Sequence, residues 1–128
     1  MAALDRAVAA LVYASAALGV VFLAVAYGLI PGWLFYSIMG GEFAWIVCAV
    51  ATVRRASWAP YLALVLALVT LSVSLPQPAH YTFAENGQLV AFAIFAGGSA
   101  LEVALIVAVA LRFVKGRGRG ISSEALRP

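Results

Sequence analysis

Four long apolar runs dominate the chain, and short segments that contain turn-forming or basic residues separate them. The first and third runs contain no charged residue, whereas the second contains one glutamate, Glu42, and the fourth contains another, Glu102. A helix of about 18 to 25 residues crosses a hydrocarbon core about 30 Å thick and satisfies its backbone groups internally. The pattern therefore predicts four transmembrane helices, over about residues 7–30, 33–53, 58–75 and 88–114.

Composition supports membrane insertion and argues against a soluble fold. Of the 128 residues, 66% are hydrophobic and 10% are charged, whereas a soluble domain carries about 25% charged residues. Too little polar surface is present to coat a water-soluble fold of this size. We therefore expect the lipid bilayer to be the main surroundings of the chain.

Turn signals between the runs indicate how the helices are connected. Pro31 and Gly32 stop the first helix and leave room only for a tight turn, so the first two helices are expected to be antiparallel neighbours. The fold class that follows is an all-α integral membrane protein, with four transmembrane helices in an up-down antiparallel bundle. We assign residues 1–114 to this single transmembrane domain and residues 115–128 to a basic, flexible cytoplasmic tail.

Basic residues indicate the orientation, because lysine and arginine near a span are retained on the cytoplasmic side. All eight lie before the first run, between the second and third runs, or after the fourth run, whose apolar part ends at Leu111: Arg6, Arg54, Arg55, Arg112, Lys115, Arg117, Arg119 and Arg127. We therefore expect a multi-pass protein of the cell (plasma) membrane with both termini in the cytoplasm. Lipid headgroups are the expected contacts of Arg54, Arg55, Lys115, Arg117 and Arg119. The excess of arginine over lysine suggests a GC-rich prokaryotic source.

A cleaved signal peptide is the alternative for the first run, because Ala24-Val25-Ala26 has the small-x-small form of a cleavage site. The run is much longer than the apolar core of a signal peptide, which has about 7 to 15 residues, and Asp5 cancels the charge of Arg6 before it. Cleavage would leave three spans and place the new N-terminus outside. We expect the uncleaved protein with four spans.

Small residues recur along the second and fourth runs at the spacing of one helix face. They are Ser37, Gly41, Ala44, Cys48 and Thr52 in the second run and Ala93, Gly97, Ala100, Ala104 and Ala108 in the fourth, at a constant offset of 56 residues. Small residues let membrane helices approach closely, so these two stripes are expected to pack helices together. The constant offset also raises the hypothesis of a duplicated helical hairpin. Chance is the alternative, because an alanine-rich sequence produces such stripes readily.

Glu42 and Glu102 are the most informative residues, because leaving an acid within hydrocarbon costs a few kcal/mol. Both lie about 15 to 18 Å from the cytoplasmic end of their helices, roughly opposite the small-residue stripes. If the stripes join the four helices, the glutamates face another protein surface or a cavity, which favours a partner subunit or further copies of the chain. Alternatively, the glutamates face each other inside the bundle, and the stripes meet partners or lipid. Their role is either proton or cation handling or packing through a hydrogen bond.

Other candidate chemistry is sparse. The predicted outer loop carries a polar cluster of His80, Tyr81, Glu85 and Asn86, but one histidine and one glutamate make a poor metal site, so we expect a surface histidine. Cys48 is the only cysteine and is expected to be a packing residue. We predict no metal and no cofactor, and no catalytic motif is recognised in the sequence.

Two functions remain open. The first is a non-catalytic accessory or scaffold subunit of a membrane protein assembly, with its acidic face buried against a partner. The second is a small proton- or cation-coupled transporter or channel that acts as a homo-oligomer through Glu42 and Glu102. An enzyme is less favoured than either, nucleic acid binding is not expected, and the sequence identifies no substrate. The expected partners are the lipid bilayer and either further copies of the chain or other membrane subunits.

Overall fold

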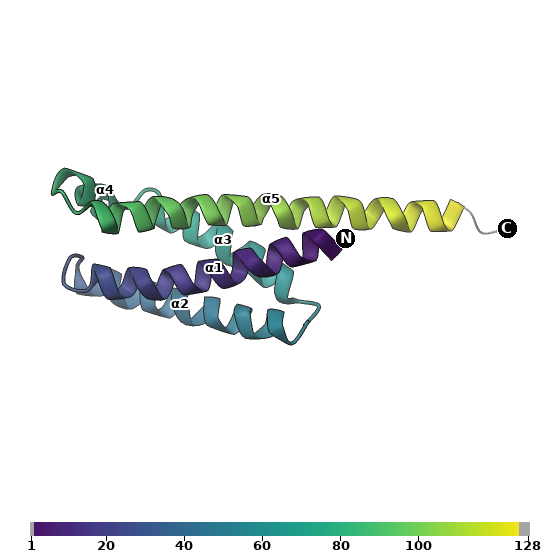
Figure 1. Ribbon diagram of the computed structural model, residues 1–128, viewed down its shortest axis with the longest axis horizontal. Coiled ribbons are helices and arrows are strands. Elements are labelled where there is room, and N and C mark those ends of the chain that lie inside the picture. The colour runs from purple at the N-terminus through teal and green to yellow at the C-terminus, as the bar shows by residue number, and fades with distance from the viewer. Residues whose placement is uncertain (1, 126–128) are drawn as a thin grey trace.

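The computed structural model of the protein describes residues 2–125, and within this range it consists of five helices and no strands (Figure 1). The helices are α1 (Ala2–Ala26), α2 (Gly32–Val53), α3 (Ala59–Ser74), α4 (Pro78–Glu85) and α5 (Leu89–Ala125). By length and composition, α1, α2 and α5 could each cross a membrane. A fourth candidate span consists of α3 and α4 together, with a bend of 63° between them. The predicted all-helical class with several long apolar helices is therefore confirmed.

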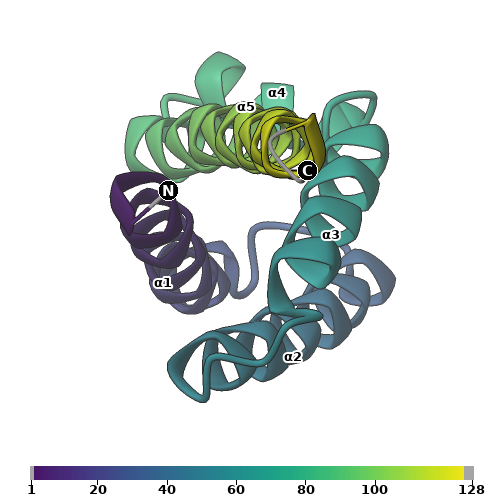
Figure 2. The same ribbon diagram turned by 90° about the vertical axis from the view of Figure 1, so that its right-hand side faces the viewer.

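The four longer helices form a ring around a common centre, in which α1 contacts α2 and α5, and α3 contacts the same two helices (Figure 2). Neighbouring helices run in alternate directions, so the N-terminus and the connection between α2 and α3 lie at one end of the bundle (Figure 1). The turn between α1 and α2 lies at the other end, together with α4. We call these the basic end and the far end. At the basic end, Arg112 Nε donates to Asp5 Oδ1 at 2.5 Å and so links α5 to α1.

The first helix differs from its predicted range of residues 7–30, because it begins at Ala2 and ends at Ala26. Gly28 has a φ angle of +77°, the left-handed conformation that ends many helices and that glycine adopts without steric cost. The amide of Leu29 donates to the carbonyl of Ala26 and closes this turn. Pro31 then precedes the first residue of α2, so the connection occupies residues 27–31 and not only the predicted Pro31-Gly32 turn.

The segment from Lys115 onward also differs from the prediction. We expected a flexible tail, but α5 continues as one helix through Ala125. Glycine in a helix interior costs about 1 kcal/mol relative to alanine, and the segment contains Gly116, Gly118 and Gly120. Extending an existing helix needs no new nucleation step, so the long apolar part of α5 carries the helix through these glycines. Residues 126–128 of the predicted tail, with Arg127, lie outside the described residues.

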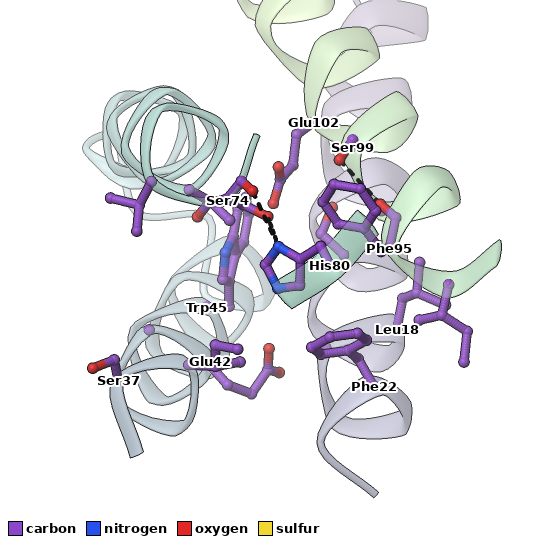
Figure 3. A pocket seen from close by; sticks show the side chains of 18 of the residues that line it. Leu18, Phe22, Ser37, Glu42, Trp45, Ser74, His80, Phe95, Ser99 and Glu102 are labelled. Atoms are coloured by element: carbon purple, nitrogen blue, oxygen red, sulfur yellow. Dashed lines mark hydrogen bonds between the residues drawn. The ribbon is translucent and has the colours of Figure 1, made fainter. Parts of the chain in front are cut away.

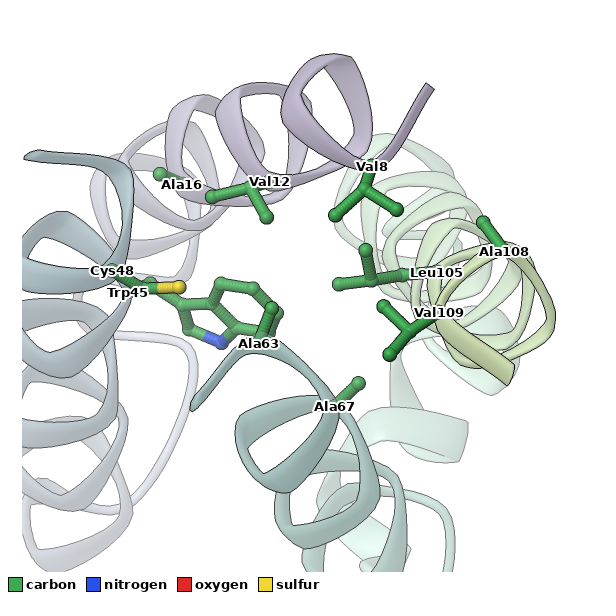
Figure 4. Packing of buried hydrophobic residues seen from close by; sticks show 10 residues of the cluster. All are labelled: Val8, Val12, Ala16, Trp45, Cys48, Ala63, Ala67, Leu105, Ala108 and Val109. Carbon is green, nitrogen blue, oxygen red and sulfur yellow. The ribbon is translucent and has the colours of Figure 1, made fainter. Parts of the chain in front are cut away.

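Buried apolar residues form two clusters, one in each half of the bundle. The basic-end cluster contains Val8, Val12, Ala16, Trp45, Cys48, Ala63, Ala67, Leu105, Ala108 and Val109 (Figure 4). The far-end cluster contains Phe22, Ala26, Ile30, Leu34, Phe83 and Ala91. In the first cluster, the fully buried Ala63 and Ala67 allow α3 to approach the other helices closely. In the second, Phe83 of α4 is buried at the end of the bundle, so α4 covers that end.

Candidate functional site

A cavity of about 370 Å³ lies inside the bundle, and all five helices contribute to its wall. Its lining extends from Trp45 of the basic-end cluster to Phe22 and Leu34 of the far-end cluster. Most lining residues are apolar, and the polar ones are Ser15, Ser37, Glu42, Thr70, Ser74, His80, Ser99 and Glu102. The cavity therefore combines an apolar wall with a small number of polar groups, which is the usual composition of a small-molecule site.

The two glutamates of the apolar runs both line this cavity, Glu42 from α2 and Glu102 from α5. Their side chains point into it from different helices (Figure 3). Glu42 is only 6% exposed and Glu102 only 8%. The sequence left open whether the two acids face outward or toward the interior of the bundle. In the structure they face the interior.

The carboxyl group of Glu42 lies directly against the backbone of α1 at Gly19. A Cβ atom built on Gly19 would stand only 1.7 Å from Glu42 Oε2. Any residue larger than glycine at position 19 would therefore overlap the carboxyl group in its present position. Gly19 is a site residue that the sequence did not reveal, because its role depends on which residue α2 places opposite it.

Two polar atoms of the lining are buried with no hydrogen-bond partner among the described residues. They are Glu42 Oε1 and Ser15 Oγ, and Ser15 lies one helical turn before Gly19. An unpaired buried polar atom costs about 1 to 3 kcal/mol. Proteins rarely keep such groups without a role, so these two atoms mark the part of the cavity where a ligand would be held.

The prediction of a surface histidine at position 80 is wrong. His80 is 3% exposed and lines the cavity. Its Nδ1 atom lies 3.0 Å from the carbonyl oxygen of Ser74, which can only accept a hydrogen bond, so Nδ1 carries a proton. The imidazole stacks on the ring of Phe95, with a centroid distance of 4.6 Å. The sequence prediction failed because it treated residues 78–85 as a loop. They form α4, and His80 and Phe83 share the face that this helix buries.

The other members of the predicted polar cluster do not join the site. Tyr81, Glu85 and Asn86 are exposed and are not part of the cavity lining. The hydroxyl of Tyr81 donates to the carbonyl of Leu75, which joins α4 to the end of α3. Of the four residues in the cluster, only His80 faces the cavity.

The prediction that the small-residue stripe of α5 packs helices together is wrong for most of its length, because only Ala108 is buried, in the basic-end cluster. Ala93, Gly97, Ala100 and Ala104 are all exposed. Burying Glu102 turns the opposite face of α5 outward.

The small-residue stripe of α2 divides along its length. Ser37 and Gly41 are exposed at the cavity, Ala44 is half-buried, and Cys48 is fully buried in the basic-end cluster. The Cys48 thiol lies 3.6 Å from the carbonyl oxygen of Ala59, so α2 contacts α3 at this point. Only the part of the stripe toward the basic end therefore packs helices together.

The cavity opens sideways between α2 and α3. Four of its lining residues are exposed at the surface, and all four lie on these two helices: Ser37, Gly41, Val69 and Val73. Along the ring, the opening lies on the side away from the α1 and α5 pair.

The electrostatics of the cavity favour a positively charged ligand. Two carboxyl groups line it, and no lysine or arginine of the described chain does. The hydroxyls of Ser37 and Ser99 donate to backbone carbonyls of their own helices, so they supply little further polarity to the cavity. Residues 2–125 contain no group of three or more histidine, cysteine, aspartate or glutamate side chains that could hold a metal ion. No protein-family model, curated protein or solved structure matches the chain.

Proposed function

We propose that this protein is a multi-pass protein of the cell membrane in which α1, α2, α3 and α5 cross the bilayer, with both termini in the cytoplasm. The hydropathy and length of α1, α2 and α5 support three of the spans. The α3 helix has 16 residues, fewer than the roughly 20 that a span needs, and α4 completes it at the far end. The positive-inside rule supports the orientation, because Arg6, Arg54, Arg55 and Arg112 belong to the basic end.

Its function, in this proposal, is to bind and move a proton or a cation through Glu42 and Glu102. One observation carries the proposal: two glutamates from different helices, each more than nine-tenths buried, line the same cavity. Intramembrane acids of this kind mark ion and proton pathways in many membrane proteins. The sequence alone places an accessory subunit first, with its acidic face buried against a partner. Because both acids line a cavity of this chain, cation handling is the better supported function.

Flux through the reconstituted protein tests this function. The purified protein is placed in liposomes, and proton movement and ²²Na⁺ uptake are measured after an imposed gradient. Glu42→Gln and Glu102→Gln keep the shape of each side chain but remove the ionisable group, so we expect flux to fall about tenfold or more. Glu85→Gln is the matched control, because Glu85 is exposed on α4 and is absent from the cavity lining. Equal flux in all four proteins, or none in the wild type, would contradict cation and proton transport.

An accessory role is the second candidate, and the exposed stripe on α5 favours it. Ala93, Gly97, Ala100 and Ala104 form an outward face of small residues, which is typical of contacts between membrane helices. The chain would then bind a neighbouring subunit or another copy of itself through this face. The mass of the complex purified in mild detergent tests the role. Gly97→Ile should release the partner, whereas Gly40→Ile should not, because Gly40 is an exposed helical glycine outside the stripe.

A further inference from the structure

The cavity is much larger than a proton or an inorganic cation requires. Its volume is about 370 Å³, whereas one water molecule occupies about 30 Å³ of liquid and an apolar cavity of about 150 Å³ holds one benzene ring. A space of this size can hold a benzene ring together with a substituted ammonium group. The dimensions therefore fit an organic ligand of modest size.

The wall offers separate partners for an apolar body and for a positive charge. Phe22, Trp45 and Phe95 present aromatic side chains, which attract both apolar groups and cations. Glu42 and Glu102 supply the negative charge. An anion would meet two carboxyl groups with no lysine or arginine among the described lining, and a neutral molecule would leave the acids without a charge partner.

A second observation also points to a ligand at the acidic part of the cavity. Glu42 Oε1 is buried and has no hydrogen-bond partner among residues 2–125, and the same is true of Ser15 Oγ. Both residues are more than nine-tenths buried and line the cavity. A bound cation would stabilise the carboxyl group at the position where it now lacks a partner.

The route into the cavity lies on its side. At the far end, α4 covers the bundle with His80 and Phe83, which are 3% and 1% exposed. The basic-end cluster fills the other end. The exposed lining residues of the cavity lie instead on α2 and α3, among them Val69 and Val73 of α3. This side of the bundle would face the hydrocarbon region, where an amphipathic molecule dissolves and an inorganic ion does not.

We propose that the cavity binds an organic ammonium ion with an apolar body, and that this ligand enters from the bilayer between α2 and α3. The inference rests on the proposed function, because it uses the same two glutamates as the charge partner. It adds the chemical class of the ligand and the route by which it reaches them.

Two probes of the same shape test the ligand class. Benzyltrimethylammonium carries a permanent positive charge, and neopentylbenzene is its neutral counterpart, with carbon in place of nitrogen. Binding of each is measured by equilibrium dialysis against the protein in phosphatidylcholine nanodiscs, after subtraction of uptake by empty nanodiscs. We expect the cation to bind and Glu42→Gln to weaken its binding about tenfold or more. The same substitution should leave the neutral probe nearly unaffected. Equal effects on the two probes would overturn the proposed ligand class.

A matched pair of valines tests the route. Val69 and Val65 lie one turn apart on α3 and are 55% and 54% exposed, but only Val69 lines the cavity. Val69→Trp should slow association of benzyltrimethylammonium about tenfold, whereas Val65→Trp should leave its rate unchanged. The pair Gly41→Phe and Gly40→Phe repeats the test on α2, in case one tryptophan variant fails to fold. Equal association rates within both pairs would overturn the lateral route.

The outcomes separate this inference from the proposed function. If benzyltrimethylammonium does not bind, but proton or ²²Na⁺ flux still depends on Glu42 and Glu102, the organic ligand is refuted and cation handling stands. If the organic cation binds in a glutamate-dependent way and no flux of any cation is found, the ligand class stands and transport is refuted. If the glutamates affect neither binding nor flux, both proposals are refuted.

Discussion

The substitution Gly19→Ala is expected to displace the carboxyl group of Glu42 while leaving that residue in the chain. The added Cβ would lie 1.7 Å from Glu42 Oε2 and 2.6 Å from Cδ, whereas ordinary van der Waals contact begins at 3.4 Å. The oxygen therefore has to move by roughly 1.7 Å, which is within reach of a change of side-chain rotamer. Moving the end of a glutamate costs less than moving the backbone of two packed helices, so Glu42 moves.

The expected change in stability is small, because two contributions oppose each other. A strained glutamate rotamer costs about 0.5 to 1.5 kcal/mol, and alanine is more favourable than glycine in a helix by about 1 kcal/mol. The free energy of unfolding in detergent should therefore change by less than about 1 kcal/mol. Function should change more, because the carboxyl group leaves the position from which it reaches a ligand. We expect benzyltrimethylammonium affinity and cation flux to fall about tenfold.

Two further variants decide whether the effect arises at Glu42. Gly40→Ala is the control, because a Cβ at Gly40 meets no atom within 4 Å, so this variant should keep wild-type binding and flux. Gly19→Ala made in a Glu42→Ala background tests the contact itself. Without the carboxyl group the alanine should no longer be strained, which gives a coupling energy of about 1 kcal/mol in a double-mutant cycle. Zero coupling, or a Gly19→Ala protein that binds and transports like Gly40→Ala, would refute the reasoning.

The remaining predictions concern packing and topology. Leu105→Ala should lower the free energy of unfolding by about 2 kcal/mol, because it removes buried contacts and opens a cavity in the basic-end cluster. Val103→Ala is the control, because this side chain is 51% exposed, and it should change the free energy of unfolding by less than about 0.5 kcal/mol. If both substitutions lowered the free energy of unfolding equally, the packing described here would be contradicted. In a Cys48→Ala background, a membrane-impermeant maleimide should label Glu85→Cys in intact cells and Ser57→Cys only after permeabilisation. The reverse labelling pattern would contradict the proposed orientation.

Most of the helical structure could be predicted from the sequence, because apolar runs of this length satisfy their backbone groups only as helices. The predicted range 33–53 differs from α2 by one residue at its start. The end of α1 was predicted too late, although Gly28 was a visible signal for a left-handed helix end. The helical tail of α5 was not predicted, since local composition argued for a flexible segment. There, continuation of a long helix outweighed three unfavourable glycines.

The candidate site was predictable only in part. Glu42 and Glu102 stood out because acids within apolar runs are costly and rare. His80 was misplaced, since nothing in a loop of mixed composition indicated that α4 would fold over the end of the bundle. Gly19 and Ser15 could not be identified from the sequence, because the residue pattern of α1 does not show which of its faces meets Glu42. Their importance comes from the residue that a different helix places against them.

By itself, the sequence determined the helical class, the approximate positions of the long helices and the confinement of basic residues to their ends. These properties are local, because each apolar segment satisfies its backbone hydrogen bonds by forming a helix without help from the other segments. Only the tertiary structure decided which face of each helix is buried. That choice depends on the whole ring of helices, because turning Glu42 and Glu102 inward exposes the stripe of α5 and creates the cavity. In the proposed membrane topology, the physical reason is that an acid is costly to place in lipid, whereas packing between small residues stabilises only weakly.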